Sequence, residues 1–231
     1  MDATPLDNPF WSSLRSIHRG HAIGSSDRAA RYPLEFAPFL GVANGDVSAD
    51  EMIAPLLASG ETVLLLGVAP RLSCHWWLDP LGELAQMIRT EPLDVPDGPD
   101  IIALDEAHRA DALALTALVY PHYFRPRTME LGRYFGIYMP DNSGEVRLAA
   151  MIGERLGTEA HTEMSAICTH PDFTGRGYAR RLTAFLSNDT LARGRTPFLH
   201  VSHENPRAKS LYERIGYRLR RNIPFWSLRR A

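Results

Sequence analysis

The sequence of 231 residues predicts a fold of the α/β (α+β) class, with a mixed, mainly antiparallel sheet flanked by helices. Short apolar runs typical of strands alternate with segments whose apolar residues recur at helical spacing. A turn-rich segment, residues 140–144, separates two strand-like runs in the manner of an antiparallel hairpin. A glycine-containing turn, residues 174–179, connects a third such run to a helix.

The first 95 residues have an α/β pattern but no legible chemical motif. The expected elements are helices over residues 8–17 and 50–59 and a buried strand over residues 62–68. We expect residues 1–95 to form an N-terminal α/β extension or a degenerate second copy of the later module. Residues 90–100 contain three prolines and a glycine, which is typical of a linker, so a second domain is expected over residues 96–231.

The second part of the chain predicts more elements. In order, they are a strand over residues 101–104, a helix over 106–119, a short helix over 127–131, a hairpin of 134–139 and 146–155, a strand over 162–169, a helix from 178, a strand over 197–201 and a helix from 206. The helix from 178 carries an apolar stripe of Tyr178, Leu182, Phe185 and Leu186.

The turn from Thr174 to Ala179 has the properties of a phosphate-binding loop. It opens a helix, where unpaired backbone N–H groups and the helix dipole favour an anion. Gly175 and Gly177 would let a diphosphate approach the backbone, and Arg176 can add a charged hydrogen bond. A Rossmann fingerprint is excluded because Arg180 stands where its third small residue belongs, and a P-loop sequence is absent.

A second motif spans residues 204–217. Asn205 suits a helix N-cap, Pro206 suits the first helical position, and Gly216 suits the left-handed residue that follows the last turn. These signals delimit one short helix, which presents Tyr212 on its apolar face. A buried strand over residues 197–201 precedes it.

Together the two motifs resemble those of the GNAT superfamily of acetyl-CoA-dependent N-acyltransferases over residues 100–230. The first resembles Arg/Gln-x-x-Gly-x-Gly/Ala, with Thr174 in place of the usual Arg or Gln, and the second resembles Asn-x-x-Ala-x-x-Leu-Tyr-x-x-x-Gly-Phe/Tyr. The resemblance implies acetyl-CoA as acyl donor and a sheet that splays beside residues 167–169. The cofactor-binding residues that it implies are Ile167, Cys168, Thr169, Thr174, Gly175, Arg176, Gly177, Tyr178, Ala179 and Asn205.

Acyl transfer to an amine requires a proton acceptor and a proton donor. Glu163 lies 11 positions before Thr174, where some members of the superfamily carry a glutamate base. Strand alternation would place Glu163, Ser165, Ile167 and Thr169 on one face. Tyr212 resembles the tyrosine that protonates the departing thiolate, since a phenol with an ordinary pKa of about 10 stays protonated until the thiolate forms. The alternative bases are His161, His200 and His203. An acyl-cysteine intermediate on Cys168 is disfavoured.

Charge is unevenly distributed. Residues 171–231 hold 13 Arg and Lys against 4 Asp and Glu, although the whole chain has a net charge of −2. A basic end suits the phosphates of CoA. The rival interpretations are a nucleic-acid patch, disfavoured because aromatic stacking motifs are absent, and charge pairing with the acidic remainder of the chain.

Other classes of protein are disfavoured. Cys74 and Cys168 are too few for a disulfide framework or a cysteine zinc cluster, and a metal at Cys74 and His75 is not expected. No apolar run approaches the ~20 residues of a membrane span, and Met1-Asp2 does not begin a signal peptide. We therefore expect a cytoplasmic protein.

The sequence thus predicts an acetyl-CoA-dependent N-acetyltransferase, in which a primary amine attacks the thioester directly in a ternary complex. The alternative is a non-catalytic acyl-CoA sensor or scaffold of the same fold. The acceptor is not identified, although residues 123–131, with Arg127 or Glu130, lie where this superfamily commonly shapes the acceptor pocket. Acyl-chain length stays open, as does assembly into a homodimer.

Overall fold

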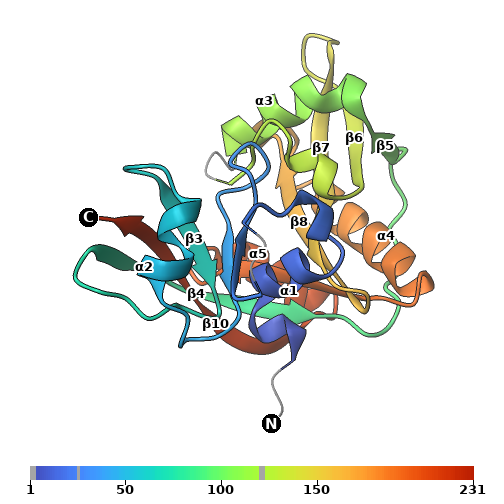
Figure 1. Cartoon of the computed structure of the whole chain (residues 1–231). Helices are drawn as coiled ribbons and strands as arrows, with labels where there is room; N and C mark the ends of the chain where they lie inside the picture. Colours follow the sequence, from blue (N-terminus) through green and yellow to red (C-terminus); the bar gives the residue numbers. More distant parts are fainter. Residues whose placement is uncertain (1–3, 25–26, 120–122) are drawn as a thin grey trace.

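The computed structural model describes residues 4–24, 27–119 and 123–231, so the expectation for Met1-Asp2 lies outside the described residues. Its main feature is an eight-stranded sheet in the order β3-β10-β4-β9-β8-β7-β6-β5 (Figure 1). The strands are β3 (Thr62–Leu66), β4 (Trp76–Ile88), β5 (Ile102–Leu104), β6 (Tyr134–Pro140), β7 (Val146–Gly157), β8 (His161–Thr169), β9 (Thr196–Ser202) and β10 (Arg218–Arg230).

The sheet is mixed and mainly antiparallel, as predicted. Each neighbouring pair runs antiparallel except β8 and β9, which are parallel. The parallel pairing is short, from His161 opposite Thr196 to Glu163 opposite Phe198. The connection between these two strands is α4 (Tyr178–Ala192), as a parallel crossover requires.

Helices cover both faces of the β6 to β8 region (Figure 1). α3 (Arg109–Val119) packs Ala112 and Leu115 against Met151 and Cys168, whereas α4 buries its predicted apolar stripe in a different cluster, with Ile152. α5 (Pro206–Arg214) follows β9 and is capped by Asn205, whose Oδ1 accepts a hydrogen bond from the backbone N–H of Ala208 at 3.0 Å. Short 3₁₀ helices fill the connections: η4 (Glu106–His108), η5 (Thr128–Leu131) and η6 (Pro171–Phe173).

The N-terminal half contributes strands to the same sheet. Its β3 and β4 lie on either side of β10, the last strand of the chain. The remaining elements pack around these strands; they are η1 (Pro5–Asp7), α1 (Pro9–Arg15), η2 (Arg19–His21), β1 (Ala29–Arg31), β2 (Leu40–Val42), α2 (Ala49–Met52) and η3 (Ala54–Leu56). The sheet is therefore shared by both halves, and the domain boundary at residue 95 stays a prediction.

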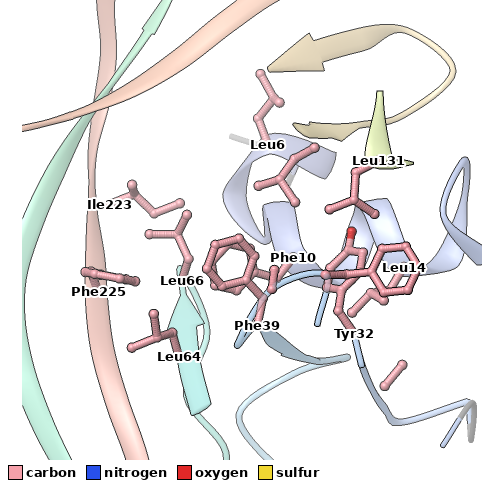
Figure 2. Packing of buried hydrophobic residues seen from close by; sticks show 14 of the residues in the cluster. Leu6, Phe10, Leu14, Tyr32, Phe39, Leu64, Leu66, Leu131, Ile223 and Phe225 are labelled. Atoms are coloured by element: carbon pink, nitrogen blue, oxygen red, sulfur yellow. The ribbon is translucent and has the colours of Figure 1, made fainter. Parts of the chain in front are cut away.

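A buried hydrophobic cluster joins α1 to β3 and β10 (Figure 2). Phe10 of α1 stacks on Phe39, with ring centroids 4.2 Å apart and planes 9° apart. Leu64 and Leu66 of β3 and Phe225 of β10 belong to the same cluster of apolar side chains (Figure 2). This cluster fixes α1 against the edge strand β3 and its neighbour β10.

One predicted helix differs from the structure, and one open question about charge is answered. The helix predicted over residues 50–59 is instead α2 followed by η3, because Pro55 has no backbone N–H to continue an α-helix. The basic end of the chain is strand β10, and several of its arginines pair with acidic residues: Arg220 and Arg221 with Asp7, at 2.8 and 2.7 Å. Among the described residues, no helix is both long and apolar enough to cross a membrane.

His18 is a buried polar residue whose hydrogen bonds connect the two halves of the chain. Its Nε2 donates to the carbonyl of Leu131 at 2.8 Å, so its Nδ1 accepts from the hydroxyl of Ser13 at 3.0 Å. The Tyr32 hydroxyl, 2.8 Å from Nδ1, donates to Ser13 Oγ at 3.0 Å. Ser13 Oγ in turn accepts from the backbone N–H of Gly157 in β7. Burial lowers the pKa of His18 to about 4, which holds the ring neutral.

This buried histidine should make stability depend on pH. The folded pKa of His18, about 4, lies below the unfolded value of 6.5, so the unfolded chain binds more protons and stability is lost as the pH falls from 6.5 towards 4. At pH 5 the loss is about 2 kcal/mol. Denaturant unfolding of wild type and His18→Gln between pH 7.5 and 5 measures it. The variant should show a flatter dependence; parallel curves would contradict this assignment.

Candidate functional site

The candidate site lies where β8 and β9 separate. Their pairing ends at Glu163 and Phe198, after which β8 continues to Thr169 without a described partner in β9. Beside the separation, β8 carries a bulge against β7: Gly153 pairs with Ser165 and Met151 with Cys168, which leaves an extra residue on β8. The splay expected beside residues 167–169 is therefore present and begins directly after Glu163.

The bulge places Ala166 at a φ of +49°, an unusual backbone conformation for a residue with a side chain. It also changes which residues share a face. Met164 and Ile167 pack in the same cluster as α4, whereas Ala166 and Cys168 pack with α3. The predicted simple alternation from Glu163 to Thr169 is thus wrong beyond Ser165, because the extra residue reverses the alternation.

A cavity of about 570 Å³ fills the space between the separated strands. Its lining comes from both halves of the chain. The residues are Phe10, Phe39, Leu66, Leu81, Leu84, Tyr123, Arg155, Glu163, Met164, Ser165, Ala166, Ile167, His200, Val201, Ser202, Glu204, Asn205, Ala208, Tyr212 and Phe225. The cavity therefore brings together both predicted catalytic residues, Glu163 and Tyr212, with Ile167 and Asn205.

Glu163 is buried, with 1% of its surface exposed, and both carboxylate oxygens have partners. Oε1 accepts from His200 Nδ1 at 2.8 Å and from Arg155 Nη2 at 3.2 Å, and Oε2 accepts from Arg155 Nε at 3.1 Å. Burial alone would raise the pKa of Glu163, but the charge of Arg155 and the bond from His200 outweigh it and lower the pKa to about 2. The carboxylate is therefore ionised and is a weak base in the resting protein.

Gln86 of β4 determines which nitrogen of His200 carries the proton. Gln86 Oε1 accepts from Arg220 at 2.7 Å, and its Nε2 donates to the carbonyl of Leu6 at 2.8 Å. Because arginine can only donate and a carbonyl can only accept, the amide has one orientation. The second hydrogen on Nε2 then points to His200 Nε2, 3.0 Å away, so His200 donates to Glu163 through Nδ1.

The other titratable candidates are less suited to the site. His161 lies at the start of β8, bonds Thr158, and does not line the cavity. Burial lowers its pKa, with further contributions from Arg220 and Arg195. His203 is exposed and lies outside the cavity lining. Burial raises the pKa of Cys168 to about 12, which opposes thiolate chemistry.

Both glycines of the predicted phosphate-binding turn have a left-handed backbone conformation and open surroundings. Gly175 and Gly177 have φ values of +80° and +82°, and a Cβ added to either would meet nothing within 4 Å. The backbone can therefore be approached closely at both positions. Tyr178 anchors the start of α4 in the core, whereas Arg176 is exposed over the ring of Phe173, 4.9 Å away.

The segment predicted to shape the acceptor pocket contributes only in part. Tyr123 lines the cavity. Arg127 and Glu130 instead pair with each other through two hydrogen bonds, at 2.7 and 2.8 Å, and neither lines it. Within the described ranges, no group of three or more His, Cys, Asp or Glu side chains is arranged to hold a metal.

Comparison with known proteins shows the family of this chain. The family model of the FR47-like protein matches residues 136–226. A crystal structure from Novosphingobium aromaticivorans, of a protein assigned to the GNAT family of acetyltransferases, is 32% identical; the match covers 99% of this chain and 100% of that one, with a TM-score of 0.84. The chain matches none of the curated proteins with which it was compared.

A GCN5-related N-acetyltransferase from Kribbella flavida is 16% identical over 94% of this chain and 93% of its own, with a TM-score of 0.63, and shares the fold. On the Novosphingobium match, this protein belongs to the GNAT family. Acyl transfer is the activity that the fold of this family suggests.

Sequence reasoning missed three residues that hold the site. None of the three belongs to a local sequence motif. Arg155 acts through Glu163, 8 positions away, and Gln86 acts through His200, 114 positions away. Ala166 is an ordinary residue in an unusual backbone conformation. A buried glutamate in a strand does call for a counter-charge, and Arg155 on the preceding hairpin strand was a candidate on that ground.

Removing the positive charge of Arg155 should show how strongly the stability of the site depends on it. Arg155→Met would leave the Glu163 carboxylate buried without a cation, and we expect a loss of about 3 kcal/mol in the free energy of unfolding at pH 7. The double variant Arg155→Met/Glu163→Gln should recover a substantial part of that loss. Equal unfolding midpoints for the single and double variants would show that the pair is not coupled.

Proposed function

We propose that this protein is an N-acetyltransferase that moves the acetyl group of acetyl-CoA to a primary amine by direct attack in a ternary complex. The observation that carries the proposal is the cavity between the separated strands β8 and β9, with buried Glu163 and Tyr212 in its lining. The open glycine turn at the start of α4 supports CoA as the donor, because it can accept a diphosphate.

In this proposal the turn from Thr174 to Ala179 holds the diphosphate, and the backbone of Ile167, Cys168 and Thr169 bonds the pantetheine arm as an added strand would. Asn205 lines the cavity, but its Oδ1 already accepts the hydrogen bond that caps α5. Its contact with the acyl donor would therefore be through the hydrogens of its side-chain amide. The Thr174 hydroxyl donates to the carbonyl of Pro171 at 3.0 Å, which leaves the diphosphate to backbone N–H groups and Arg176.

The chemistry requires a new C–N bond, cleavage of the C–S bond, and one proton moved from the amine to the thiolate. Tyr212 would protonate the thiolate. Glu163 would accept the amine proton, directly or through water. Because Arg155 and His200 lower its pKa, the carboxylate cannot deprotonate a free ammonium efficiently, so the amine would attack in its neutral form. As the C–N bond forms, the nitrogen becomes cationic and more acidic, which reduces the demand on the base.

One observation favours the alternative, a non-catalytic acyl-CoA sensor. Glu163 is already neutralised by Arg155 and His200, as a purely structural carboxylate would be. A sensor would bind acetyl-CoA but release no thiol with any amine.

Donor binding can be tested at the glycine turn. Gly177→Glu puts a carboxylate where the diphosphate would lie, and we expect CoA affinity to fall at least about tenfold, ~1.4 kcal/mol, in calorimetric titration. Gly194→Glu is the matched control, because Gly194 has a φ of +73° with equally open space but follows the other end of α4. The control should bind normally. Failure of folded wild-type protein to bind acetyl-CoA would sink the proposal.

The proton donor can be tested at Tyr212. Tyr212→Phe should lower kcat about 10²-fold, the size typical of a lost general acid, while changing CoA affinity less than twofold. Tyr217→Phe is the control: Tyr217 is also buried, 6.1 Å from Tyr212 between ring centroids, but it bonds Ser187 and does not line the cavity. Equal rates for the two variants would remove Tyr212 from the mechanism.

A further inference from the structure

The lining of the cavity comes from two parts of the fold. One group of residues belongs to β8, β9 and the region of α5, which the proposed function assigns to the acyl donor. The second group consists mainly of apolar residues from the N-terminal half and β10: Phe10, Phe39, Leu66, Leu81, Leu84 and Phe225. We call this second group the apolar wall, and most of it comes from the first half of the chain, which has no motif of its own.

This wall is preformed. Phe10, Phe39, Leu66 and Phe225 belong to the hydrophobic cluster that joins α1, β3 and β10, and each is at most 6% exposed (Figure 2). Stacking of Phe10 on Phe39 fixes both rings, and the guanidinium of Arg155 lies over Phe39 at 4.9 Å. The aromatic rings therefore extend the wall to the Glu163 ion pair.

Among the described residues, the buried charges that line the cavity are paired. The charged lining residues in that part of the chain are Arg155, Glu163 and Glu204; the first two pair with each other, and Glu204 is exposed before α5. A cation placed against the apolar wall would lose its hydration without meeting an unpaired carboxylate there, at a considerable cost in free energy. An uncharged apolar group would instead gain by leaving water.

We infer that the acetyl acceptor is a primary amine carried on an uncharged apolar chain or ring, and that the wall of the N-terminal half selects it. This inference rests on the proposed function. The amine nitrogen would meet the thioester near Glu163, and the rest of the acceptor would lie against Phe39, Leu66 and Phe225. Diamines, polyamines and lysine side chains with neighbouring charges would be poor acceptors.

Linear alkylamines provide a direct test, since propylamine to heptylamine share nearly the same nitrogen basicity. With acetyl-CoA saturating, thiol release should show kcat/KM rising about threefold to fourfold per added methylene until the cavity is filled. The decisive pair is heptylamine and 1,6-diaminohexane, which match in chain length but differ in a terminal methyl against an ammonium. The diamine should be at least about tenfold worse.

Leu81 gives a variant that should fold. It lines the cavity but is 47% exposed, so Leu81→Ser should reduce kcat/KM for heptylamine several-fold with little effect on that for propylamine or on CoA affinity. Leu219→Ser is the matched control, because Leu219 is 48% exposed on β10 and outside the cavity lining. The control should keep the wild-type preference.

The outcomes separate this inference from the proposed function. Turnover with equal rates along the series, or a preference for the diamine, would overturn the inference and leave the acetyltransferase standing. If CoA binds but no amine is acetylated, heptylamine and 1,6-diaminohexane are titrated calorimetrically into the CoA complex. Tighter binding of heptylamine, weakened by Leu81→Ser, would still support the apolar acceptor wall; no binding, or equal binding of both amines, would overturn it.

Discussion

The buried carboxylate of Glu163 is the constraint around which the structure is arranged. It lies at the last parallel pair of β8 and β9, where a charge without partners would be very costly. Arg155 from β7 and His200 from β9 therefore bond it from the two neighbouring strands. A hydrogen-bonded chain continues from His200 through Gln86 to Arg220, and from there to Asp7 of η1.

This hydrogen-bonded chain connects the two halves of the sequence within their shared sheet. Gln86 of β4 can reach both His200 and Arg220 because β4 lies between β9 and β10. Burial would raise the pKa of Asp7, but the backbone bond from Thr4 and the bonds from Arg221 and Arg220 lower it to about 2. Asp7 is thus paired with two arginines of the basic C-terminal strand, which is the kind of charge pairing that the sequence left as one of three interpretations.

Local signals in the sequence were sufficient for most elements between residues 101 and 214, whereas β10 was not predicted. Asn205, Pro206 and Gly216 each determine a backbone conformation on their own, and they delimited α5 correctly; Gly216 has a φ of +94°. The glycine turn and the apolar stripe on α4 were equally predictable from local sequence. Pairing between distant strands was not predictable, because residues of β4 pair with residues of β10 more than 100 positions away.

The site was predictable in its parts but not in its electrostatics. Glu163 and Tyr212 do meet in one cavity, yet the proximity of Arg155 turns a candidate base into an ion-paired carboxylate. That change has a consequence for the acceptor. If the protein relies on a weak base, the amine must reach the thioester uncharged, and a desolvating apolar wall favours the neutral form over the ammonium. The apolar wall, which includes Phe10 and Phe225, and the lowered pKa of Glu163 would then act together. The wall would favour a deprotonated amine, and the carboxylate would need only to accept the proton of that amine once the C–N bond has formed.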